Sequence, residues 1–158
     1  MIHHISSATA QEAYASTTTA QAMHAESAKT ARKLAAAFDG AFVSCKLQEK
    51  IQGLFPAWRV HYYAASSGDK YVSFNEMGGT PANPRRFVIR LARKGERQID
   101  AADLIRQAES GEELATRYAA HLEIFWDRIG QYNALAGFLS QLENELYPVM
   151  YFARNFRF

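Results

Sequence analysis

Hydrophobic and polar positions alternate with a period of two in the segment NPRRFVIRLARKGER, residues 83–97. Phe87, Ile89 and Leu91 fall on one side of an extended chain. The other side is largely basic and carries Arg86, Val88, Arg90, Ala92 and Lys94. Because successive side chains of a β-strand point to opposite faces, this pattern predicts a strand with one core face and one basic face.

Two more strands are predicted just upstream. Residues 58–65 and 71–75 also alternate with a period of two, and the cluster Ser66-Ser67-Gly68-Asp69 between them is a turn signal. Two such runs joined by a short loop with glycine predict a β-hairpin. A longer loop, residues 77–84, leads to the basic strand at 85–92. The simplest topology is therefore an antiparallel meander of three strands, to which the aromatic C-terminal segment 147–158 adds a fourth strand or docks on the core.

Apolar residues recur at spacings of three and four on both sides of this region, which predicts helices. The predicted helical segments are 8–38, 41–54, 100–108 with Asp100 as the N-cap, and 111–146. The chain as a whole is expected to form a single domain, residues 1–158. Its fold class is α+β, with a small antiparallel sheet of three or four strands packed against long N- and C-terminal helices.

The last predicted helix is long for a domain of this size. At 1.5 Å per residue, residues 111–146 would span roughly 50 Å. One interpretation is that Gly130 or Gly137 interrupts the helix, and another is that it packs antiparallel along the first helix. A third is that two copies of this helix pair to form a homodimer.

Composition places the protein among ordinary globular domains. The sequence has 158 residues with a net charge of +2, and it contains no apolar run long enough to span a bilayer. The N-terminus lacks the features of a secretory signal. The single cysteine, Cys45, lies on the apolar side of the predicted 41–54 helix, where it is expected to act as a small hydrophobe. We therefore predict a cytoplasmic protein with no membrane partner.

Charge is unevenly distributed along the chain. Residues 84–98 contain six basic residues and one acidic residue, whereas residues 99–127 contain seven acidic residues and two arginines. One interpretation is that the acidic helix neutralises the basic strand within the fold, with Arg86 and Arg90 paired to helix carboxylates. The alternative is that the basic face is left open to bind a partner.

Motifs of enzymes are absent from the sequence. There is no phosphate-binding P-loop, no dinucleotide-binding glycine motif, no nucleophile elbow and no zinc-protease motif. The weakest of three hypotheses is a small enzyme that acts on a phosphorylated substrate near Gly78, Gly79, Arg85 and Arg86. The five histidines lack metal-ligand spacing. We predict no enzyme, no metal and no cofactor.

The strongest functional signal is the mixture of cations and aromatic rings on one sheet face. If Trp58, Val60 and Tyr62 point to the core, the opposite face collects the polar residues of the three strands. With the adjoining loop and turn, the predicted partner-binding residues are Arg59, His61, Tyr63, Tyr71, Asn75, Arg85, Arg86, Arg90 and Lys94.

Tyrosine and arginine are enriched as anchors of protein interfaces, and cations interleaved with aromatic rings also bind single-stranded nucleic acid. We predict first a non-enzymatic interaction protein that binds a macromolecular protein partner. A narrower version is a regulator or inhibitor of a larger nucleoprotein assembly, of the kind that mobile elements encode. The alternative is a single-stranded RNA- or DNA-binding protein that uses the same face.

Overall fold

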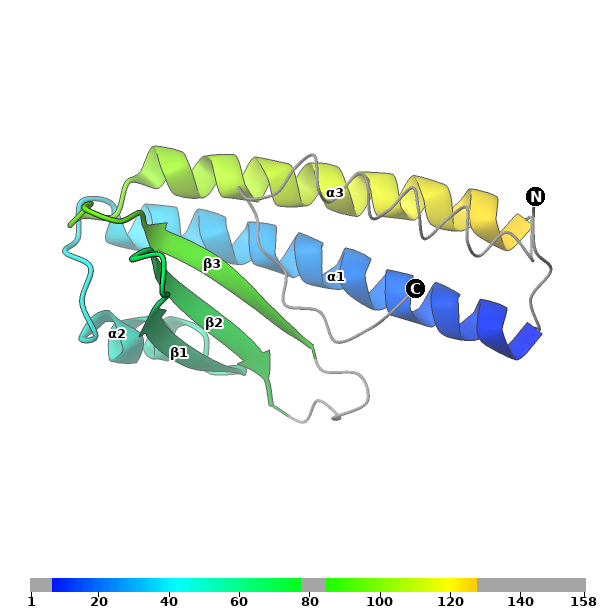
Figure 1. The fold of residues 1–158 in the computed structure, drawn as a ribbon, viewed down its shortest axis with the longest axis horizontal. Coiled ribbons are helices and arrows are strands. Elements are labelled where there is room, and N and C mark those ends of the chain that lie inside the picture. Colours follow the sequence, from blue (N-terminus) through cyan, green and yellow to red (C-terminus); the bar gives the residue numbers. More distant parts are fainter. Residues whose placement is uncertain (1–6, 78–84, 128–158) are drawn as a thin grey trace.

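Three helices and a three-stranded sheet make up the part of the chain that the computed structural model describes, residues 7–77 and 85–127 (Figure 1). In chain order these are α1 (Ser7–Phe38), α2 (Leu47–Leu54), β1 (Trp58–Ala64), β2 (Lys70–Glu76), β3 (Arg86–Ala92) and α3 (Ala101–Asp127). The predicted α+β class is confirmed. The predicted helix over 128–146, the loop 78–84 and the segment 147–158 lie outside the described residues.

The sheet is an antiparallel meander in the order β1-β2-β3, as the alternation predicts. Val60 pairs with Phe74 and Phe74 pairs with Phe87, so one row of apolar side chains crosses all three strands. The Phe74 ring stacks on Phe87 with 4.9 Å between ring centroids and meets Phe55 edge-on at 5.3 Å. This inner face forms one buried cluster with the side chains of α1 and α2.

Helices α1 and α3 run side by side as an antiparallel pair (Figure 1). Their contacts join the end of α1 to the start of α3: the Asp39 carboxylate accepts from the Ala101 amide at 3.1 Å, and Arg32 pairs with Glu112 at 2.6 Å. Small residues on α1, among them Ala28 and Ala31, are buried in this region. For residues 101–127, the predicted antiparallel packing along the first helix is confirmed.

The predicted break between helices 100–108 and 111–146 is wrong, because α3 runs without interruption from Ala101 to Asp127. Gly111 is buried in the helix interior. A glycine there costs only about 1 kcal/mol relative to alanine, which tertiary packing readily offsets. The predicted N-cap is confirmed, since the Asp100 carboxylate accepts from the Ala102 amide at 3.0 Å.

The predicted helix over 41–54 begins only at Leu47, so its first part is wrong. Phe42 instead forms an isolated bridge with Gln98, and the Val43 amide donates to the Arg97 carbonyl at 2.9 Å. These backbone groups pair with the segment before α3, which prevents helix formation. Phe42 is 68% exposed and Cys45 is exposed, so Cys45 is not the buried hydrophobe that the helical pattern predicts.

Glutamine side chains bond backbone groups on both edge strands of the sheet. On β1, the Val60 amide donates to Gln52 at 3.0 Å and the Tyr62 amide donates to Gln48 at 2.9 Å, both from α2. On β3, Gln107 of α3 bonds both backbone groups of Arg90. An uncovered edge offers a row of backbone groups for pairing with another chain, so these amides protect the sheet from edge-to-edge association.

No helix in the described ranges, 7–38, 47–54 and 101–127, has the length and apolarity needed to cross a membrane.

The turn between β1 and β2 gives the first prediction. Gly68 has φ +94°, and an added Cβ would lie 2.9 Å from the Lys94 side chain. We expect Gly68→Ala to lower the free energy of unfolding by about 1–2 kcal/mol, because an L-residue is strained in the left-handed region. Urea denaturation measures this change.

The matched control is Gly53→Ala. Gly53 lies within α2, and nothing lies within 4 Å of an added Cβ. Alanine should stabilise that helix by up to about 1 kcal/mol. Equal effects of the two substitutions would contradict the role of the left-handed turn.

Candidate interaction surface

The strand register places the predicted polar residues on one side of the sheet, which we call the outer face. It consists of three cross-strand rows: Arg59, Asn75 and Arg86; His61, Ser73 and Val88; and Tyr63, Tyr71 and Arg90. Toward β3 this face is buried, since Ser73, Val88 and Arg90 have almost no exposed surface. Its accessible part therefore lies over β1 and the adjoining side of β2.

Three stacked rings dominate this accessible part. Tyr63 lies between His61 and Tyr71, with ring centroids at 6.0 and 5.7 Å and interplanar angles of 15° and 21°. His61 is exposed, and both tyrosines are half-buried. We call these three residues the aromatic ladder. Stacked pairs of this kind contribute about 0.5–1.5 kcal/mol each beyond burial, so the ladder is a preformed surface feature.

The remaining predicted residues near the ladder differ in exposure. Arg59 is exposed at the start of β1, and Asn75 is half-buried beside it on β2. Arg86 is half-buried. Arg85 is exposed, and its Nε lies 3.1 Å from Glu76 Oε2 in an ion pair. Of these, Arg59 adjoins the aromatic ladder with an accessible charge.

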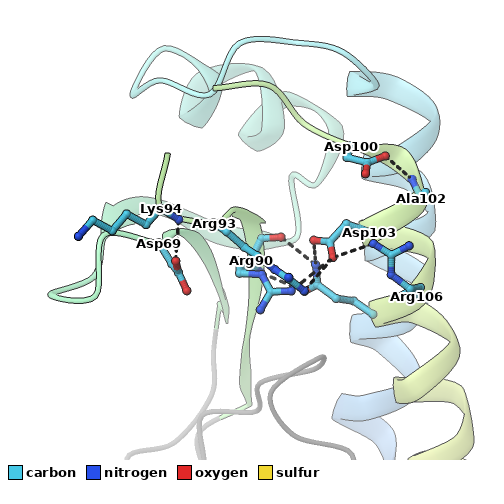
Figure 2. Close-up of polar contacts among 9 residues, drawn as sticks. Asp69, Arg90, Arg93, Lys94, Asp100, Ala102, Asp103 and Arg106 are labelled. Carbon is cyan, nitrogen blue, oxygen red and sulfur yellow. Dashed lines mark hydrogen bonds and ion pairs between the residues drawn. The ribbon is translucent and has the colours of Figure 1, made fainter. Parts of the chain in front are cut away.

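Lys94 lies apart from the ladder, beside the turn that joins β1 and β2. Its amide donates to the Asp69 carboxylate at 2.8 Å (Figure 2). Its side chain passes over Gly68. The sequence groups Lys94 with the basic strand face, but the structure places it in this turn contact.

Arg90 lies in a buried ion pair. Only 6% of the residue is exposed, and its Nη2 lies 3.4 Å from Oδ1 of Asp103 on α3. The interpretation in which the acidic helix neutralises the basic strand is therefore confirmed for Arg90. Because so little of Arg90 is accessible, the structure does not favour it as a contact residue for a partner.

Asp103 also contacts two exposed arginines (Figure 2). Nη2 of Arg93 lies 3.7 Å from the same Oδ1 atom, and Nη2 of Arg106 lies 3.4 Å from it. Oδ2 accepts from the Gln107 amide at 3.3 Å. We call Arg90, Arg93, Arg106 and Asp103 the arginine cluster. Sequence reasoning missed it, although Asp103, Arg106 and Gln107 have the helical spacing that puts them on one face.

Tyr62, on the inner side of β1, has a shifted pKa. Burial raises the pKa of its phenol, and the electrostatic interaction with Cys45 raises it further. Its backbone amide is held by Gln48 of α2. Tyr62 is half-buried and packs against the core cluster.

Within residues 7–77 and 85–127, no group of three or more histidine, cysteine, aspartate or glutamate side chains could hold a metal ion. Comparisons of the chain with protein-family models, with curated proteins and with solved structures found no match.

Proposed function

We propose that the protein acts by binding, not by catalysis, and that it binds a protein partner through the accessible part of the outer face. The contact residues are Arg59, His61, Tyr63, Tyr71 and Asn75. The observation that carries this proposal is the aromatic ladder, which places stacked rings beside the exposed Arg59 on a sheet surface. Rigid aromatic and arginine side chains are the residues that supply most of the binding energy at protein interfaces.

The ladder favours a protein partner over a single-stranded nucleic acid. Single-strand binders stack bases on open ring faces. Tyr63 already has two nearly parallel neighbouring rings, His61 and Tyr71. Nucleic-acid binding also needs several cations for phosphates. Arg90 is committed to Asp103 and Arg85 pairs with Glu76, which lowers the available positive charge.

The glutamine contacts at the sheet edges disfavour a partner that binds by adding a β-strand. A partner that adds a β-strand needs free backbone groups at an edge. Glutamines from α2 and α3 already bond the backbone of Val60, Tyr62 and Arg90. We therefore propose recognition by side chains of the outer face, in which Arg59 meets carboxylate or carbonyl oxygens of the partner.

A site-specific crosslinking experiment tests this proposal. A photo-crosslinking amino acid at position 61 should give one dominant protein adduct in cells, and the same group at the exposed position 117 on α3 should not. Arg59→Glu should weaken this interaction by roughly 30-fold, since loss of an interface anchor costs about 2 kcal/mol. Arg117→Glu, also an exposed arginine, should leave the adduct unchanged.

Two outcomes would contradict the protein-binding proposal. If crosslinking from positions 61 and 117 gave the same adducts, the outer face would not be the interface. The second outcome is measured by fluorescence anisotropy of labelled single-stranded RNA or DNA titrated with the protein. Binding with a steep salt dependence that Arg59→Glu abolishes would favour the nucleic-acid alternative.

The narrower interpretation, a regulator or inhibitor of a nucleoprotein assembly, stays a prediction, which the identity of the crosslinked partner tests. The hypothesis of an enzyme acting on a phosphorylated substrate also stays a prediction. Gly78 and Gly79, on which it depends, lie outside the described residues.

A further inference from the structure

We propose that Arg93 and Arg106, held on either side of Asp103, form an oxyanion-binding site that accepts a phosphate or carboxylate group. This inference concerns the arginine cluster on β3 and α3 and does not depend on the proposed partner of the outer face.

The charge of the cluster is not balanced. Nη2 atoms of Arg90, Arg93 and Arg106 lie 3.4, 3.7 and 3.4 Å from one carboxylate oxygen of Asp103. Three guanidinium groups against one carboxylate leave two positive charges in a small volume, and like charges at such separations repel. Asp103 is also in the first turn of α3, where the helix dipole favours negative charge. A second anion at this position would offset the excess positive charge, and the helix dipole would favour its binding.

The two outer arginines remain accessible to a ligand. Their side chains are 57% and 60% exposed for Arg93 and Arg106, respectively. Because both contact the same oxygen atom, they lie close enough together for one phosphate or carboxylate to reach both. Each guanidinium has five N–H donors, most of which remain available after the contact with Asp103. Planar guanidinium groups are well suited to oxyanions.

The base of the site is buried and fixed. Gln107 bonds the Arg90 backbone and donates to Asp103 Oδ2, which holds the strand and the helix in register. Arg90 is 6% exposed, and its buried Nε has no hydrogen-bond partner among the residues that the structure describes. The cluster therefore contains unused, buried donor capacity beneath two exposed cations. A fixed arrangement of donors also lowers the entropy cost of binding.

Titration of the full chain with inorganic phosphate, pyrophosphate and citrate tests this site. The titration is followed by amide chemical shifts at constant ionic strength. We expect saturable binding with shifts centred on Arg93, Asp103 and Arg106. Tighter binding of pyrophosphate than of citrate would identify a phosphate ligand, and the reverse order would identify a carboxylate.

Substitutions at the two exposed arginines complete the test. Arg93→Gln with Arg106→Gln should weaken binding at least tenfold, since a hydrogen bond to a charged group accounts for about that factor. Arg117→Gln, an exposed arginine on the same helix that pairs with Glu113, is the matched control and should bind as the unmodified protein does. Non-saturable shifts, or equal binding by all three proteins, would overturn the proposal.

Discussion

Replacing Asp103 by alanine is expected to lower the free energy of unfolding by about 3–5 kcal/mol, because it leaves a buried arginine without its counter-charge. Arg90 is 6% exposed and lies 3.4 Å from the Asp103 carboxylate. The contacts from Arg93 and Arg106 add little to this figure, since both side chains are mostly in water. Urea denaturation with an unchanged m-value measures the loss.

Glu112→Ala is the matched control for this prediction. Glu112 forms a shorter ion pair than Asp103, 2.6 Å to Arg32, but about half of each side chain is exposed. Its loss should cost less than about 1 kcal/mol, since water replaces an exposed partner. The comparison separates burial from distance as the source of the energy.

A double variant tests the mechanism directly. Adding Arg90→Met to Asp103→Ala removes the buried charge, and replacing a buried ion pair by apolar groups is often close to neutral. We therefore expect the double variant to recover most of the lost stability. A loss below about 1 kcal/mol in Asp103→Ala alone would show that Arg90 has another source of compensation.

Strand β1 could be predicted because one of its faces is buried and the other is more exposed. The alternation of Trp58, Val60 and Tyr62 with charged or polar neighbours gives a period that only an extended chain explains. The turn at Gly68 and the N-cap at Asp100 also follow from local chemistry. In these places the local sequence preference and the fold agree.

The remaining features depend on contacts between distant segments. The helix predicted over 41–54 has a suitable apolar pattern, but Phe42 and Val43 pair with residues 97–98 instead. Gly111 is a poor helix former and suggests a helix end, but α3 continues through it to Asp127 because the helix packs on the rest of the fold. The exposure of Arg90 could not be predicted either, because alternation shows which side chains share a face and not which helix covers that face.

Replacing Gln107 by alanine is the second large effect that we expect, a loss of about 2–4 kcal/mol. Gln107 is 1% exposed; its side chain accepts from the Arg90 amide at 3.1 Å and donates to the Arg90 carbonyl at 2.9 Å. Alanine leaves these two backbone groups without partners at a buried edge, and each such group costs about 1–3 kcal/mol. Denaturation measures the total, and hydrogen exchange of the Arg90 amide measures the local opening.

The control for this prediction is the equivalent contact on the other edge of the sheet. Gln52 accepts from the Val60 amide at 3.0 Å and donates to the Trp58 carbonyl at 2.6 Å, but it is only half-buried. Water can replace it there, so Gln52→Ala should cost less than Gln107→Ala. If the Arg90 amide kept its protection from hydrogen exchange in Gln107→Ala, the Gln107 side chain would not be what shields this edge strand. The expected result is faster exchange of the Arg90 amide. If the variant also associates in a concentration-dependent way, Gln107 prevents β3 from pairing with another chain.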